Sequence, residues 1–195
     1  MKLMYLTLVW TMVFASSAWA APEDRGPRGS YVALGSGVLI GQATDESGRS
    51  TGAHSGSNTH LRFGEEVIPR LTLGLEMGGG SLTGLNEQYT GNLGGLFVQA
   101  GWRPFQTMEA LHFLFSTGIG GGSLTSSTDE DFSGSVAGSL YSVSIQYEFK
   151  FGDDLGDGLI VAPYVRGIFA PQSGDSKTRI YTTVIGIESG WHFGR

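Results

Sequence analysis

The stretch from Thr178 to Phe193 alternates between two kinds of side chain along its whole length. One side is mostly apolar with aromatic residues near both ends, and the other side is small or ionisable. A side-chain period of two predicts a β-strand. A soluble sandwich can give the same alternation. A long apolar face with aromatic residues near both ends is more typical of a strand that crosses a membrane, with lipid outside and a narrow polar lumen inside.

Seven more stretches alternate in the same way, and together they predict an all-β fold: a closed antiparallel up-and-down transmembrane β-barrel of about eight strands. Small residues such as Gly35 and Gly37 fall on the inward side, as a narrow lumen requires. Glu65 falls on the outward side and is therefore expected near the membrane edge. Pro163 should weaken its strand locally, because it cannot donate a ladder hydrogen bond. The predicted strands cover residues 30–43, 58–68, 71–81, 92–105, 111–121, 139–151, 159–169 and 178–193.

The connections alternate in length. Residues 44–57, 82–91 and 122–138 are expected to be long loops, whereas 69–70 and 106–110 are short turns. Outer-membrane barrels have short periplasmic turns and longer extracellular loops, so both termini should lie on the periplasmic side. That topology predicts two aromatic girdles. The periplasmic girdle is Trp102, Phe149, Phe151, Trp191 and Phe193, and the outer girdle is Tyr141, Phe169 and Tyr181.

The N-terminus has the features of a cleaved secretory signal peptide over residues 1–20. Lys2 precedes an apolar stretch from Leu3 to Phe14, and Ala18-Trp19-Ala20 provides a cleavage site. A short periplasmic lead-in over residues 21–29 and a single barrel domain over residues 30–195 complete the expected organisation. Loss of Lys2 with the leader changes the net charge from −6 to −7, which argues against a nucleic-acid partner. The chain has no Cys, so no disulfide or thiolate metal site is possible.

With these features the chain resembles the small outer-membrane β-barrels of the OmpA-transmembrane, OmpX and OmpW-like class. The signal peptide, the alternating strands, the stretch Ala162-Pro163-Tyr164-Val165 and the aromatic ending Trp191-His192-Phe193 carry the resemblance. It implies a location in a Gram-negative outer membrane. In this class a C-terminal strand that ends in Phe or Trp resembles the signal read by the barrel-assembly machinery; here Gly194-Arg195 follow Phe193.

Ionisable residues recur on the inward faces of the predicted strands. They could form a gated ion path or a catalytic cluster, or they could be paired charges that fill the lumen. The last reading is favoured, because an eight-stranded barrel has room only for its own side chains and buried charges must be paired. The predicted polar network in the lumen is Arg62, Glu66, Glu76, Arg103, His112, Glu148, Lys150, Arg166 and Glu188.

A lipid A-modifying enzyme is one alternative, because similar eight-stranded barrels use His, Ser and an acidic residue. His112 and Ser116 share a face here, but they are about 13 Å apart along a strand, too far for a hydrogen bond. The acidic segment Asp129 to Asp131 could bind a divalent cation, although a solvated loop is the simpler interpretation. No catalytic residue, cofactor site or metal site is therefore predicted.

The function expected from the sequence is that of a structural or surface-interaction scaffold that works through its extracellular loops. A channel for small or hydrophobic solutes is the second hypothesis. The expected partners are outer-membrane lipid, lipopolysaccharide and the barrel-assembly machinery. The surface ligand is not named by any sequence feature.

Overall fold

The computed structural model describes residues 29–44, 48, 50, 52–83, 89–105, 107, 108, 110–126, 134–152, 157–171 and 179–193. The predicted signal peptide, the lead-in before Gly29 and the acidic segment from Asp129 to Asp131 lie outside these residues. Within the described part of the chain, no helix is long and apolar enough to cross a membrane.

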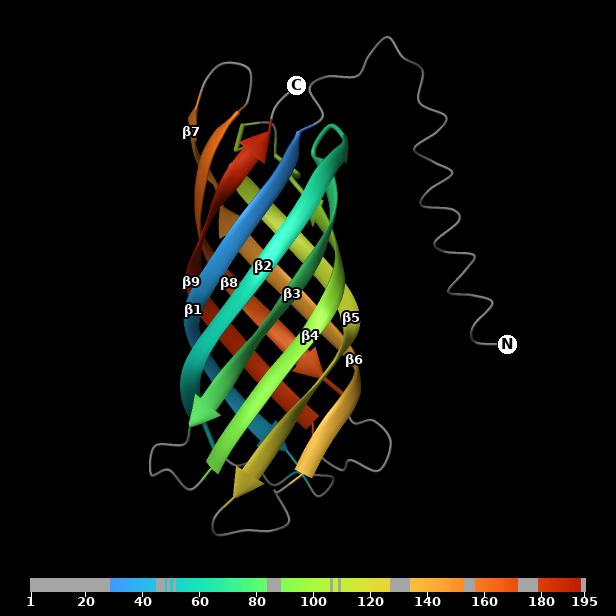
Figure 1. Ribbon diagram of the computed structural model, residues 1–195, viewed down its shortest axis with the longest axis vertical. Coiled ribbons are helices and arrows are strands. Elements are labelled where there is room, and N and C mark those ends of the chain that lie inside the picture. The colour runs from blue at the N-terminus through green and yellow to red at the C-terminus, as the bar shows by residue number, and fades with distance from the viewer. Residues whose placement is uncertain are drawn as a thin grey trace, which may run out of the picture.

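All regular structure in these residues is β-strand, and neighbouring strands pair antiparallel (Figure 1). Each strand except β6 pairs with the next along the chain. β1 also pairs with β9 and β6 pairs with β8, so the sheet closes on itself. The fold class predicted from the sequence is thereby confirmed. The strands are β1 (Ser30–Thr44), β2 (His54–Ile68), β3 (Leu71–Thr83), β4 (Tyr89–Trp102), β5 (Leu111–Ser126), β6 (Gly134–Tyr147), β7 (Phe149–Gly152), β8 (Gly158–Ala170) and β9 (Arg179–Phe193).

These nine segments make eight barrel strands, because β6 and β7 are two halves of one strand interrupted at Glu148. Both halves pair with β8 in the same register, and the gap lies opposite Pro163. The Glu148 N–H donates to the carbonyl of Ala110, 2.7 Å away on the β5 side. Backbone groups alternate in direction along a strand, so those of Tyr147 point toward β8, where Pro163 has no N–H to donate. The local weakness was predicted for the strand that contains Pro163, but β8 is continuous through Pro163 and the break lies in the neighbouring strand.

The two ends of the barrel differ. β2 ends and β3 begins, β4 ends and β5 begins, and β7 ends and β8 begins at the end of the barrel where β1 starts and β9 stops (Figure 1). We call this the short-turn end. The opposite ends of the strands define what we call the loop end. Glu65 pairs with Ser30, the first residue of β1, so it lies near the short-turn end as expected for a charged residue on the outer face.

Three of the predicted loops are too long. The predicted loop 44–57 includes the first four residues of β2, and the predicted loop 122–138 includes the end of β5 and the start of β6. The predicted loop 82–91 likewise includes the end of β3 and the start of β4. These ends lack apolar alternation, but their backbones still pair, as Ser55 does with Thr83. Ladder hydrogen bonds need backbone groups and not apolar side chains, so the strands continue past the apolar part of the outer face.

The outer face carries the apolar residues of the alternating pattern. Leu34, Met77, Ile119 and Ile187 are among the large apolar side chains that are about half or more exposed. All residues of the two predicted girdles point outward; Phe169 is partly covered and stacks on Tyr181 with ring centroids 4.8 Å apart. In the girdle predicted on the periplasmic side, Trp102, Phe149, Phe151, Trp191 and Phe193 are exposed. In the predicted outer girdle, Tyr141 and Tyr181 are exposed.

The lumen has two layers, of which only the polar one was predicted. Toward the loop end the inward side chains form an apolar layer, in which Leu39, Leu140 and Val184 are at most 1% exposed. Asn58 and Thr182 are buried polar residues on the inward face near this layer. The apolar layer consists of Leu39, Ala43, Leu82, Leu93, Phe97, Leu140, Tyr164, Ile168, Ala170, Ile180 and Val184.

Candidate functional site: the polar layer of the lumen

The polar layer lies in the lumen between the apolar layer and the short-turn end, beside a smaller apolar cluster of Tyr31, Ile160 and Ala162. Its charged core consists of three glutamates, and each is paired with its own arginine. Buried charges are tolerated only when they are paired and hydrogen-bonded, and here acids and bases balance. The pairs are Glu188 with Arg62, Glu76 with Arg166, and Glu148 with Arg103.

Glu188 of β9 accepts from two residues of β2. The Arg62 guanidinium contacts one carboxylate oxygen, and Nε2 of His60 lies 2.9 Å from the other. The guanidinium also lies over the ring of Tyr31, 4.9 Å from its centroid. Both oxygens of a fully buried carboxylate are therefore satisfied, and these contacts tie β2 to β9, the two neighbours of β1, on the inner face of the barrel.

Glu76 of β3 is bound in a similar way, here by an arginine of β8 on the opposite side of the barrel. Arg166 donates to one carboxylate oxygen and also to the Ser142 hydroxyl at 3.1 Å, while Nε2 of Gln99 donates to the other oxygen at 3.1 Å. The Arg166 guanidinium lies 5.0 Å from the centroid of the Phe97 ring. Phe97 belongs to the apolar layer, so this cation–π contact joins the two layers.

Glu148, at the break between β6 and β7, has three partners. Arg103 donates at 2.8 Å, Gln146 donates at 2.7 Å, and Nδ1 of His112 lies 3.1 Å away. The other ring nitrogen of His112 lies 3.3 Å from the Thr72 hydroxyl, so the imidazole is held at both ends. This group lies closest to the short-turn end.

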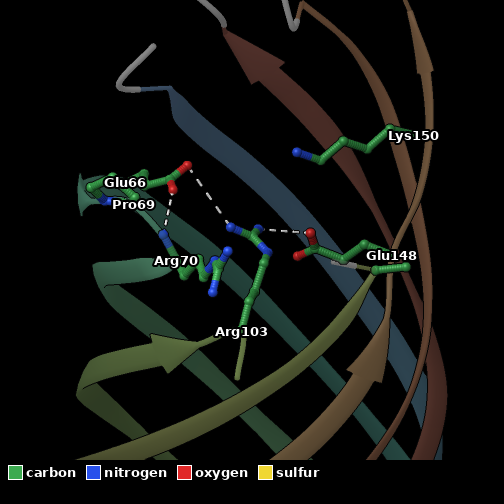
Figure 2. Close-up of a pocket in the computed structure, with 7 residues that line it drawn as sticks. Glu66, Pro69, Arg70, Arg103, Glu148 and Lys150 are labelled. Carbon is green, nitrogen blue, oxygen red and sulfur yellow. Dashed lines mark hydrogen bonds and ion pairs between the residues drawn. The ribbon is translucent and has the colours of Figure 1, made fainter. Parts of the chain in front are cut away.

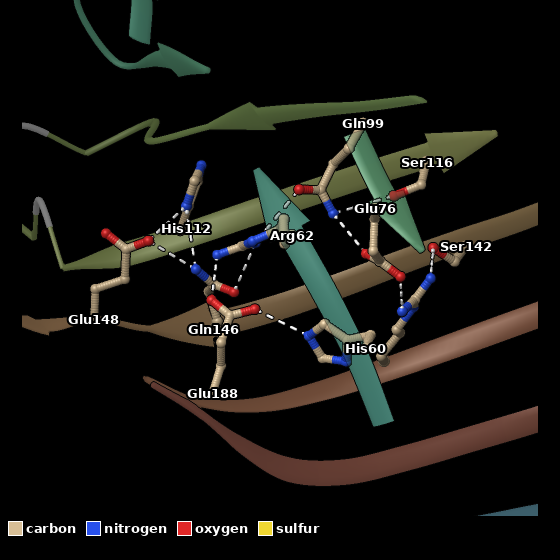
Figure 3. Close-up of polar contacts among 11 residues, drawn as sticks. His60, Arg62, Glu76, Gln99, His112, Ser116, Ser142, Gln146, Glu148 and Glu188 are labelled. Carbon is tan, nitrogen blue, oxygen red and sulfur yellow. Dashed lines mark hydrogen bonds and ion pairs between the residues drawn. The ribbon is translucent and has the colours of Figure 1, made fainter. Parts of the chain in front are cut away.

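Two glutamines join the three groups into one network (Figure 3). Arg62 donates to the side-chain oxygens of Gln146 at 3.1 Å and Gln99 at 3.4 Å. Each glutamine then uses its amide nitrogen to donate to a different carboxylate, Glu148 or Glu76. Arg62 is therefore the central residue, because it connects all three glutamates directly or through one side chain.

Inward glycines make room for these large side chains. A Cβ at Gly101 would collide with His112 and Thr72, one at Gly35 would collide with the His60 ring, and one at Gly64 would collide with Tyr31. The small inward residues expected from the sequence are thus matched to particular rings on neighbouring strands.

The structure brings seven of the nine residues predicted for the network into its buried, hydrogen-bonded core. Glu66 joins at the edge of this core: it is half-buried, binds the turn and forms an ion pair with Arg103 at 3.9 Å. Lys150 lies outside the network, exposed at the short-turn mouth. Sequence reasoning did not include the glutamines that connect the charges, although both lie on the inward phase of their strands. The seven are Arg62, Glu76, Arg103, His112, Glu148, Arg166 and Glu188.

The network is built for pairing charges and gives no sign of a nucleophile with its base. His112 is engaged by Glu148 and Thr72, whereas the Ser116 hydroxyl accepts from Gln99 at 3.3 Å. Among the residues that the structure describes, no three His, Asp or Glu side chains are placed to hold a metal ion.

Comparison with known structures gives matches that span nearly all of the matched chains. Neisserial surface protein A is 10% identical with a TM-score of 0.50, and the match covers 84% of this chain and 98% of that one. The chain has the fold of the small eight-stranded outer-membrane barrels. Ail, the attachment invasion locus protein of Yersinia pestis, in complex with the heparin analogue sucrose octasulfate, is 13% identical with a TM-score of 0.47, over 84% and 99% of the two chains.

The N-terminal β-barrel domain of Pseudomonas aeruginosa OprF is 12% identical with a TM-score of 0.43, over 83% and 97% of the two chains. No protein-family description matches the sequence. A search of curated proteins also finds no match. At these identities the comparisons establish the fold alone.

Proposed function

We propose that this chain is an outer-membrane protein with a filled, non-conducting barrel that serves as a scaffold for surface interactions through the connections at its loop end. The filled lumen is the observation that carries the proposal. Three glutamate–arginine pairs occupy one layer, and Leu39, Leu140 and Val184 are almost completely buried in the other. A permeant ion would have to displace paired charges and then cross a mostly apolar layer with few polar groups to replace its water.

The outer face supports the membrane location. Its exposed apolar side chains run around the barrel and include Val38, Leu75, Val143 and Val165. A soluble protein rarely exposes so large an apolar surface. Membrane lipid and lipopolysaccharide are the partners proposed for this face. The ending Trp191-His192-Phe193 is proposed as the signal read by the barrel-assembly machinery.

Cell fractionation combined with gel electrophoresis of heated and unheated samples tests the location. We expect an outer-membrane band whose mobility changes on heating, because a closed barrel resists detergent until it is heated. A soluble periplasmic protein without a mobility change would contradict the proposal.

Conductance in planar lipid bilayers tests the filled lumen. We expect no steps of ionic current from the purified barrel at any voltage that the bilayer tolerates. Regular current steps that persist in a heat-modifiable, correctly folded preparation would contradict a non-conducting scaffold.

A role in moving hydrophobic solutes is a second candidate, and an outer-face hollow near the loop end favours it. A cavity of about 400 Å³ is lined by Ile40, Phe169, Tyr181 and others, and a Cβ at Gly167 would touch nothing within 4 Å. A Gly167→Trp variant would fill this hollow. Slower uptake of a hydrophobic solute by cells carrying that variant, relative to Gly167→Ala, would favour the transport role over the scaffold.

A lipid A-modifying activity is the remaining alternative. Mass spectra of lipid A from cells with and without the protein test it, and we expect no difference. A changed acylation pattern would make an enzyme the leading proposal.

A further inference from the structure

The short-turn mouth contains a cavity that the filled lumen does not explain. Its volume is about 480 Å³, within the range of small-molecule pockets. The turn between β2 and β3 forms one side, and β7 forms the other (Figure 2). The lining residues are Glu66, Pro69, Arg70, Arg103, Ala110, Glu148 and Lys150.

The two carboxylates of this cavity are already bound. Glu148 holds Arg103, Gln146 and His112, as described above. Glu66 accepts from the backbone N–H of Arg70 at 2.7 Å, and Nη1 of Arg103 lies 3.9 Å from its other oxygen. Both carboxylates therefore have protein partners and do not need a ligand to satisfy them.

Two cations of the cavity remain available. Among the described residues, no carboxylate forms an ion pair with the Arg70 guanidinium or the Lys150 ammonium group. Figure 2 shows both side chains reaching into the opening from different walls, with Arg103 between them. Three cations and two occupied carboxylates leave the cavity with a surplus positive charge.

The backbone conformation of Arg70 is a second indication of a binding site here. Arg70 has φ of 71°, and it is the single non-Gly residue with positive φ in the described part of the chain. A two-residue turn with Pro first and positive φ second normally takes Gly at the second position. The turn is held by the Glu66 bond and by the Arg103 N–H, which donates to the Arg70 carbonyl at 3.0 Å. A residue kept in a strained conformation where Gly would fit better is a feature of binding sites.

We propose that this cavity binds a small anion through Arg70 and Lys150, with Arg103 as a third donor. The ligand class is an oxyanion, a phosphate or a carboxylate, because a guanidinium fork matches the geometry of both. The anion enters from the short-turn end. The site is independent of whether the lumen conducts, so its test does not depend on the role proposed above.

The test measures binding of inorganic phosphate to the full mature barrel in a neutral detergent, by NMR of the arginine side-chain N–H signals. Chloride keeps the ionic strength constant, so that general screening is not read as binding. We expect saturable shifts at Arg70 and Arg103 in the millimolar range or tighter. Acetate is titrated in parallel, and binding of acetate in place of phosphate would identify a carboxylate site.

Two variants separate binding from folding. Arg70→Gly removes the guanidinium and also relieves the turn, so the barrel should fold at least as well as the parent. Lys150→Met removes the ammonium group from an exposed position. Each should weaken phosphate binding by about tenfold or more, as expected for loss of a charged hydrogen bond. Arg179→Gln, an exposed cation at the loop end, is the matched control and should bind as the parent does.

Two results would overturn the proposal. One is the absence of saturable binding of phosphate and acetate by the parent barrel. The other is equal binding by the parent, Arg70→Gly and Lys150→Met, which would show that any bound anion uses other residues.

Discussion

Inward glycines determine which large side chains the lumen can hold. The Cβ that is absent at Gly101 leaves the space taken by His112 and Thr72, and both of these are buried. Because the His112 ring is bound at both nitrogens, it cannot move aside without losing Glu148 or Thr72.

Gly101→Ala should therefore destabilise the barrel by about 1–3 kcal/mol, the usual cost of overpacking a core. Urea unfolding in lipid vesicles, followed by tryptophan fluorescence, measures the loss. Gly167→Ala is the control, because a Cβ there meets nothing within 4 Å. Equal stability of the two variants would contradict the role assigned to Gly101.

Removal of one member of the central pair should cost more than removal of both. Glu188→Leu leaves Arg62 buried without its carboxylate, and we expect a loss of about 3–5 kcal/mol in the free energy of unfolding. The double variant Glu188→Leu with Arg62→Met should recover much of this loss. If the double variant is as unstable as the single one, the pairing of Arg62 with Glu188 is not what stabilises this part of the lumen.

At the residue scale, alternation predicted which side chains point inward but not which of them meet. Strand phase alone places Arg62, Glu76, Glu148 and Glu188 in the lumen. Their partners depend on the stagger between strands on opposite walls, which a single sequence does not contain. The links through Gln99 and Gln146 were missed for the same reason, because neutral amides stand out only once the charges around them are placed.

At the scale of the element, the break between β6 and β7 follows from one residue on the facing strand. Replacement of Pro163 by Val supplies an N–H opposite Tyr147, and the exposed position suits an apolar side chain. We expect the ladder to close, with slower hydrogen exchange at the amides of Tyr147 and Phe149. Pro171→Val, just beyond the end of β8, should leave those exchange rates unchanged.

Strand ends were the least predictable feature of the elements. The outer face ends in rows of Ser, Thr and Asn near the loop end, such as Ser81, Asn92 and Ser123, which pair across β3, β4 and β5. Their composition is that of a loop, and only the ladder shows that they belong to strands. The apolar part of each strand was predicted well, because there the side chains alternate over the same residues whose backbones pair.

At the scale of the whole molecule, the two layers of the lumen should act separately. Leu39→Ala combined with Leu140→Ala opens space in the apolar layer and should cost about 2–5 kcal/mol for each substitution. The barrel should still show no ionic current, because the glutamate–arginine layer continues to fill the lumen. Current through this variant would show that the apolar layer alone closes the parent barrel.

The closed barrel was predicted from the sequence, whereas the apolar layer was not. A polar lumen was expected, so inward apolar residues such as Leu39 and Leu140 were not assigned to a core. Leu82 lay in a predicted loop. Inward apolar residues have the same period as outward ones, displaced by one position, so alternation alone assigns Leu39 and Leu140 to the lumen. That they meet in one layer follows only from the register between strands.

The apolar layer also means that this barrel carries, inside itself, the kind of core that water-soluble proteins use. Buried leucines and paired charges inside the barrel hold its strands together. Replacing the exposed residues of the outer face with Lys, Glu, Thr and Gln, while leaving every inward residue unchanged, should therefore yield a barrel that folds in plain buffer. A barrel with a water-filled interior would keep only its backbone hydrogen bonds, without an inner core, and should not fold after the same exchange.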